Sequence, residues 1–358
     1  MNIFESLLRK HHELDFAIRD RKGKVFYSDW DCDHPWVNSY LQGIDTRLTK
    51  ESDIHLYKFY EDDEEIISKT SEFHSVREGL NYSSKSLLIG DGSTPLISSF
   101  LIWLYERGIK DLFYIPPLYY TFYYFAKLFG LNLHPISNRH PFEKGFQYNL
   151  PSKSCYLIVT DPIWYAGISL QENLISDLVK WQEKTESFIF VDGSFQYCNW
   201  NGRQKELTAS FNSEQTIRLI CPTKILAIHG FRFSYLLMPE WIRNDIRYIF
   251  ANTHGSTTAH NIRFAKRAMS ILDSDLSNSD LIAYIRDRYS FLIENGWLRS
   301  ELSPDSGYFV FSEPTKKSLS YPQLSMGGDF FEQPRYKNYI RFNLLAPDMH
   351  KHIYSMME

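Results

Sequence analysis

Short, nearly continuous apolar runs recur along the chain and alternate with longer stretches of helical periodicity. Strands that are covered on both faces show such runs, and their alternation with helices is typical of a parallel sheet. The pattern therefore predicts an α/β domain with a mostly parallel sheet, roughly at residues 50–250. The expected strands are residues 86–90, 111–115, 131–136, 154–161, 187–192, 216–221 and 233–238.

The pattern changes after residue 250, where a long helix is predicted at 278–296 and shorter strands follow it. We expect this part to be a smaller α+β domain, which the first fifty residues can join. The predicted organisation is an N-terminal segment joining the small domain at 1–48, a large cofactor-binding domain at 49–250 and a small C-terminal domain at 251–358.

Composition limits the classes of partner. The net charge of -4 gives no electrostatic reason to expect nucleic acid or an anionic membrane as a partner. The first residues lack the apolar core of a signal peptide, and no apolar stretch reaches the length of a bilayer span. The four cysteines have no metal-ligand spacing, so we expect reduced thiols, no metal and a cytoplasmic location.

Polar or glycine-rich groups follow several predicted strands, at the edge where open α/β sheets bind ligands. The turn Gly90–Thr94, "GDGST", precedes a predicted helix, and its glycines, hydroxyls and free amides suit a phosphate. The alternative is an ordinary tight turn with Ser93 or Thr94 as the helix cap. The spacing matches neither a Walker loop nor a dinucleotide fingerprint.

Three charged residues follow apolar strands of the large domain. Asp192 could pair with a protonated ring nitrogen of a cofactor, or simply cap the next turn. Lys224 could be a nucleophilic amine, with Arg232 as its cationic neighbour or as a phosphate clamp. The alternative is that both cations extend to the surface.

Arg341 lies in the last predicted strand, in "YIRFNLL". A guanidinium that forms two parallel hydrogen bonds is the natural receptor for a substrate carboxylate. Alternation along the strand places Tyr339, Arg341 and Asn343 on one face. The alternative is an exposed strand arginine.

Taken in chain order, these features resemble the fold type I pyridoxal-phosphate enzymes. The order is a glycine-serine turn, Pro-x-Tyr, an aspartate after an apolar strand, a lysine, a glycine and two arginines. The chain looks most like the class I/II aminotransferases, near the histidinol-phosphate aminotransferase branch, and Lys224, Gly230 and Arg232 match the Lys-x5-Gly-x-Arg pattern of that family. This resemblance implies a three-layer large domain with a mostly parallel seven-stranded sheet and a smaller α+β domain.

The resemblance also implies roles for individual residues around pyridoxal 5'-phosphate. Lys224 would bind the cofactor covalently and move protons during catalysis. Tyr57 would reach the phosphate of the neighbouring subunit, which implies a homodimer with shared active sites. Arg341 would bind the substrate α-carboxylate, and Trp30 would lie beside the substrate. The implied cofactor-binding set is Gly92, Ser93, Tyr119, Asp192, Lys224, Arg232, Cys221 and Tyr57.

Two positions depart from the family. Trp164 replaces the asparagine, and Phe195 the tyrosine, that donate to the phenolic oxygen of the cofactor. Tyr197 is a candidate substitute for them. The leading function is transfer of an α-amino group between a small amino acid and a 2-oxo acid. The alternatives are another pyridoxal-phosphate reaction (a decarboxylase, a β-lyase or a biosynthetic cyclase) and a phosphate-binding α/β protein that has no covalent cofactor.

Overall fold

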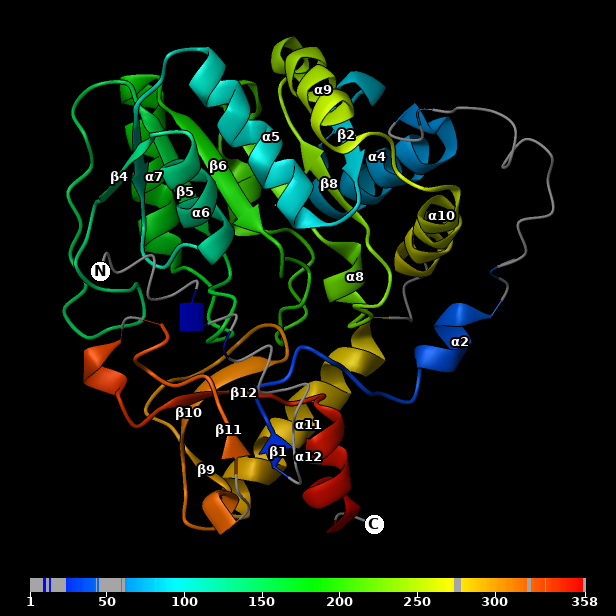
Figure 1. The fold of residues 1–358 in the computed structure, drawn as a ribbon, viewed down its shortest axis with the longest axis vertical. Helices are drawn as coiled ribbons and strands as arrows, with labels where there is room; N and C mark the ends of the chain where they lie inside the picture. Colours follow the sequence, from blue (N-terminus) through cyan, green and yellow to red (C-terminus); the bar gives the residue numbers. More distant parts are fainter. Residues whose placement is uncertain are drawn as a thin grey trace.

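The computed structural model describes residues 9–10, 13, 24–42, 44, 59, 62–80, 82–273, 278–320, 323–331 and 333–356. Figure 1 shows a large sheet flanked by helices, with a smaller assembly of strands and helices below it. The strands of the large sheet are β2 (Leu87–Gly90), β3 (Asp111–Tyr114), β4 (Asn132–Pro135), β5 (Tyr156–Thr160), β6 (Phe188–Gly193), β7 (Thr216–Ile220) and β8 (Ser234–Leu237).

The large sheet has the strand order β2-β8-β7-β6-β5-β3-β4. Strand β8 runs antiparallel to both of its neighbours, and the other pairings are parallel. All seven apolar runs of the sequence form strands in this sheet. The predicted α/β class and the mostly parallel seven-stranded sheet are therefore confirmed.

Helices cover both faces of the sheet and complete three layers. Ile158 and Phe190 pack with helices α5, α6 and α9 on one face. Leu157 and Ile189, their neighbours along β5 and β6, pack with α7 on the other face, where α4 and α10 also lie. The helices are α4 (Glu64–Glu78), α5 (Ser93–Glu106), α6 (Tyr120–Leu128), α7 (Glu172–Thr185), α9 (Glu240–His254) and α10 (Ala259–Asp273). Within the described ranges, no helix is both long and apolar enough to cross a membrane.

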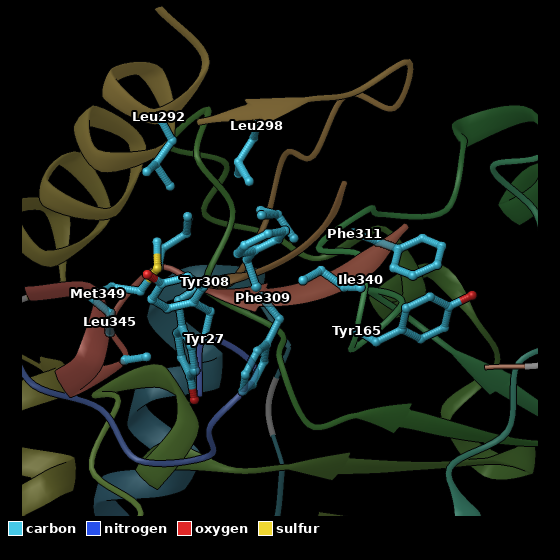
Figure 2. Close-up of a cluster of buried hydrophobic side chains, with 14 of the residues drawn as sticks. Tyr27, Tyr165, Leu292, Leu298, Tyr308, Phe309, Phe311, Ile340, Leu345 and Met349 are labelled. Carbon is cyan, nitrogen blue, oxygen red and sulfur yellow. The ribbon is translucent and has the colours of Figure 1, made fainter. Parts of the chain in front are cut away.

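The smaller part is built on an antiparallel sheet with the order β12-β10-β9. Figure 2 shows its apolar core, in which Tyr308 and Phe309 lie among side chains of the small sheet and helices, beside Tyr27 from the N-terminal segment. The elements are β9 (Leu298–Arg299), β10 (Phe309–Pro314), β12 (Ile340–Asn343), α11 (Ser279–Glu294) and α12 (Pro347–His352).

The N-terminal segment enters the smaller part through β1 (Val25–Phe26), which pairs in parallel with β11 (Gln323–Leu324). It continues into the short helix α2 (Val37–Leu41). The boundary expected at residue 250 falls inside α9, and α10 shares its apolar cluster with α4 of the large part. The exact division into domains therefore stays a prediction.

The turn before α5 differs in one respect from its prediction. The N-cap is Gly92, with φ of 87°, and Ser93 is already the first helical residue. A positive φ at this position favours glycine over residues with a side chain. The prediction of Ser93 or Thr94 as the cap was therefore wrong by one residue or more.

A buried ion pair joins α4 to the sheet. Two guanidinium nitrogens of Arg218, in β7, donate to the two carboxylate oxygens of Glu78 at 2.8 Å each. Burial alone would raise the pKa of Glu78, but the charge of Arg218 and hydrogen bonds from His74 and Arg218 hold it below its ordinary value. The carboxylate is therefore charged at neutral pH and depends on Arg218.

Replacing Arg218 with methionine is expected to lower the free energy of unfolding by about 3 kcal/mol at pH 7, because Glu78 is left buried without its cation. Because the pKa of Glu78 is lowered in the fold, its charge stabilises the wild-type fold at pH values above its unfolded-state pKa of about 4.3. This contribution to the free energy of unfolding is lost as the pH falls further. The difference should therefore shrink in denaturant titrations below that pH.

Arg107→Met is the control, since its ion pair with Asp245 is about half exposed. It should change stability by less than about 1 kcal/mol. Equal losses for the two variants would contradict this account.

Candidate active site

Asp192 and Lys224 meet at the carboxyl edge of the large sheet. Asp192 lies near the end of β6, opposite Leu219 of β7. The chain leaves β7 and turns at once into the short helix α8 (Pro222–Ile225), which carries Lys224. The Lys224 Nζ atom lies 4.6 Å from the ring centroid of Phe195 and 5.7 Å from that of Tyr119. The amine is thus half-buried over two aromatic rings, whereas Arg232 is exposed, so the surface alternative describes Arg232 and not Lys224.

Asp192 is held in place by its own turn. The backbone N–H and the hydroxyl of Ser194 both donate to its Oδ1, at 3.2 and 2.6 Å. The Cys221 thiol donates to the Ser194 hydroxyl at 3.5 Å and accepts from Ser234 at 3.0 Å. Only 4% of Asp192 is exposed, so its carboxylate is both oriented and largely withdrawn from water.

Gly92 and Arg232 form a close contact at the start of α5. A Cβ placed on Gly92 would lie 2.5 Å from Arg232 Nη2, so the guanidinium rests against this turn in space that a side chain would take. Ser93 is buried at the first helical position. Asp91 points toward Asn261, whose amide donates to it at 2.9 Å. The turn thus presents a helix start and a guanidinium, which together suit an anion.

Arg341 is fully buried, which excludes the exposed-strand alternative. Its Cζ lies 3.9 Å from the ring centroid of Trp30 and 4.3 Å from that of Phe309. Nη2 donates to the carbonyl of Ser28, whereas Nε and Nη1 are buried without a hydrogen-bond partner in the described part. Burial lowers the pKa of Arg341 to about 9. These two unpaired N–H groups are the donors that a carboxylate would satisfy.

Aromatic rings form the wall between Lys224 and Arg341. Trp164 stacks on Trp30 with centroids 5.8 Å apart and meets the ring of Tyr119 edge-on at 5.4 Å. The Tyr119 hydroxyl donates to Tyr120 at 2.7 Å, and burial raises its pKa well above the ordinary value. The indole N–H of Trp164 is buried and has no partner in the described part.

The suggestion that Tyr197 replaces the missing phenolic-oxygen donors is wrong. Its hydroxyl donates to Glu78 at 2.6 Å, and Arg218 donates to it at 3.1 Å, so it belongs to the buried ion pair beneath α4. Phe195, at the position of the expected tyrosine, packs edge-on against Tyr308 with centroids 5.4 Å apart. The Tyr197 hydroxyl is therefore part of the Glu78–Arg218 hydrogen-bond network, and it does not face Lys224.

Sequence reasoning missed a histidine–tyrosine pair beside the site. His229 Nε2 and the Tyr308 hydroxyl are 2.6 Å apart. Burial, followed by the charges of Lys224, Arg232 and Arg341, lowers the pKa of His229 to about 3, so it is neutral at pH 7. The sequence carried no signal for this pair, because its partners lie 79 positions apart in different parts of the fold.

The structure thus brings together most of the residues predicted from the sequence. One group surrounds the amine and the sheet edge, and a second surrounds Arg341 and Trp30. Tyr57 lies outside the described residues, so its predicted role stays a prediction. The residues in these two groups are Gly92, Ser93, Tyr119, Asp192, Cys221, Lys224, Arg232, Trp30 and Arg341.

No family model and no curated protein matches the chain. Solved structures do match over nearly its whole length. A probable N-succinyldiaminopimelate aminotransferase from Thermus thermophilus is 15% identical with a TM-score of 0.78, covering 98% of this chain and 97% of its own. An aspartate aminotransferase from Thermotoga maritima is 14% identical with a TM-score of 0.74, covering 98% and 96%.

A third match, YbdL from Escherichia coli, has a methionine aminotransferase function. It is 13% identical with a TM-score of 0.70, covering 93% of this chain and 92% of its own. These proteins differ in substrate but share one architecture, so the likeness speaks for the fold and leaves the substrate open. The chain has the fold of the type I, class I/II aminotransferases.

Proposed function

We propose that this protein is a pyridoxal-phosphate-dependent aminotransferase, which exchanges the amino group of an amino acid for the oxo group of a 2-oxo acid. The observation that carries the proposal is the placement of the Lys224 amine over Phe195 and Tyr119, at the same sheet edge as the buried carboxylate of Asp192. A carboxylate beside a reactive amine and an aromatic platform suits a cationic, planar cofactor ring.

The residues present fit pyridoxal 5'-phosphate. Gly92, Ser93 and Arg232 would hold its phosphate, because the glycine leaves room for the guanidinium at the start of α5. Asp192 would pair with the ring nitrogen, and Tyr119 would cover the ring. When bound, the cofactor supplies an aldehyde and a ring that accepts electrons from the substrate Cα.

The protein's own groups would bind and orient the substrate. The unpaired Nε and Nη1 of Arg341 would receive the α-carboxylate. Lys224 Nζ, which lies over Phe195 and Tyr119, would take the proton from the substrate Cα. Trp30, which covers the guanidinium of Arg341, would exclude water from that contact.

The same proposal includes a homodimer with shared active sites, in which Tyr57 reaches the neighbouring subunit's phosphate, and a cytoplasmic location. It also includes both substrates, the amino acid and the 2-oxo acid. Structural matches to aminotransferases over more than nine-tenths of the chain support the proposal without reaching these finer points.

The test is an absorbance titration of the cofactor-loaded protein with amino acids. Conversion to the pyridoxamine form, reversed by a 2-oxo acid, is the expected result. Release of carbon dioxide or ammonia without that form would instead identify another reaction of the same cofactor. A protein that is colourless once free pyridoxal 5'-phosphate has been removed would contradict the proposal.

A further inference from the structure

We propose that a cavity beside the site, walled by Tyr120, Trp164 and Phe331, receives the side chain of the amino acid substrate, and that this side chain is uncharged and flat or apolar, such as a phenyl or phenol group. This inference rests on the proposed function, because it assumes an amino acid held at Arg341.

The cavity lies along the same sheet edge as the site. It is lined by the loops that follow β3, β4 and β5 and by residues near Phe331 of the smaller part. Asp192 lies near the end of the adjacent strand β6 and Lys224 follows β7, so one edge of the sheet carries both features.

The ring of Trp164 borders both the candidate active site and the cavity. Its ring meets Tyr119 at 5.4 Å on the site side and Phe331 at 5.5 Å on the cavity side. Arg341 Cζ lies 5.6 Å from the Trp164 centroid. Trp164 is therefore a wall common to both, and the cavity lies one ring away from the carboxylate position at Arg341.

The size of the cavity suits a ring. Its volume is about 200 Å³. An apolar cavity of about 150 Å³ is enough to bind benzene in a protein core. Tyr165, whose ring stacks on Phe331 with centroids 4.1 Å apart, forms a flat wall. Figure 2 shows Tyr165 beside Phe311, at the end of the small-domain core that borders the cavity.

The lining is uncharged. Among the described residues that line the cavity there is no aspartate, glutamate, lysine or arginine. His140 is neutral, since burial lowers its pKa to about 3, and its Nδ1 lies 2.7 Å from the Tyr165 hydroxyl. The nearby carboxylate of Glu143 is bound by Arg335 at 3.1 Å and is not part of the lining. A charged substrate side chain would therefore find no counter-ion in the described lining, and burying an unpaired charge is costly.

Neutral hydrogen-bonding groups are present as well. Ser137 and Gln333 are both buried and both line the cavity. They allow a phenol hydroxyl to enter together with hydrocarbon, because each can serve as a donor or an acceptor. The chemistry of the wall therefore selects for planarity and neutrality, and tolerates one neutral polar group.

The first experiment measures equilibrium binding of 3-phenylpropionate and of succinate to the cofactor-loaded protein by calorimetry. Both ligands offer Arg341 a carboxylate, and they differ in what enters the cavity. 3-Phenylpropionate should bind about 100-fold more tightly, because the second carboxylate of succinate finds no partner. Succinate binding as tightly as 3-phenylpropionate would overturn the inference.

Two variants locate the binding. Ser137→Phe fills the cavity and should weaken 3-phenylpropionate binding at least about 10-fold, whereas Ser152→Phe, on an exposed loop, should not. Phe330→Arg places a cation at the partly exposed rim and should strengthen succinate binding at least about 10-fold. If Ser137→Phe does not fold, Phe330→Arg provides the test on its own. An unchanged affinity of Phe330→Arg for succinate would overturn the inference.

The half-reactions with phenylalanine and with aspartate separate the two proposals. Selective 3-phenylpropionate binding without conversion of the cofactor by any amino acid would leave the cavity assignment standing and remove the aminotransferase function. Equal conversion by phenylalanine and aspartate, unchanged by Phe330→Arg, would keep the function and remove the cavity assignment.

Discussion

Replacing Lys224 with alanine is expected to lower the rate of amino-group transfer at least about 1,000-fold, because a positioned proton-transfer group contributes about 100- to 10,000-fold and the covalent attachment of the cofactor is lost with it. The side chain is held over Phe195 and Tyr119, and no other lysine amine of the described residues is placed over these two rings. Stopped-flow absorbance of the half-reaction measures the rate.

Lys205→Ala is the control, because Lys205 is exposed on the loop after β6. It should react at the wild-type rate. If Lys224→Ala retained more than about a tenth of the wild-type rate while binding the cofactor, the amine would not be the proton-transfer group.

Replacing Arg341 with methionine is expected to lower kcat/KM for the amino acid about 100- to 1,000-fold, because a buried carboxylate loses its charge-assisted hydrogen bonds. Methionine preserves the apolar packing between Trp30 and Phe309. The loss should appear mainly in KM for substrates that carry an α-carboxylate, and steady-state kinetics across amine donors with and without that group would measure it.

The same variant should leave the stability of the free protein unchanged or raise it. In the protein without substrate the guanidinium is buried with two N–H groups that have no hydrogen-bond partner among the described residues. Replacing it with an apolar side chain removes the desolvation cost of those two groups. Arg218→Met, which removes a paired buried arginine, should be destabilised instead. If both variants lost stability equally, Arg341 would have a structural role and not the role of a substrate receptor.

The sheet could be predicted from the sequence because each of its strands is an apolar run bounded by polar or turn residues. The residues at the strand ends could be predicted together, since the carboxyl ends of parallel strands meet at one edge. The family resemblance supplied the pairing of distant positions, such as Lys224 with Arg341, that local pattern does not contain.

The remaining features depend on contacts between distant parts of the chain. Alternation placed Arg341 on a face of its strand, but could not show that Trp30 and Phe309 bury it. The hydrogen bond from Tyr197 to Glu78 depends on how α4 packs on the sheet. The cavity is formed by loops after three strands and by residues near Phe331, so no single stretch of sequence predicts it.

The central claim is that Lys224 binds the cofactor aldehyde covalently. The most direct measurement is reduction of the cofactor-loaded protein with sodium borohydride, followed by proteolysis and mass spectrometry. We predict one pyridoxyl group per chain, on the peptide that contains Lys224. A label on a different lysine, or no covalent label in a protein that binds the cofactor, would contradict the account.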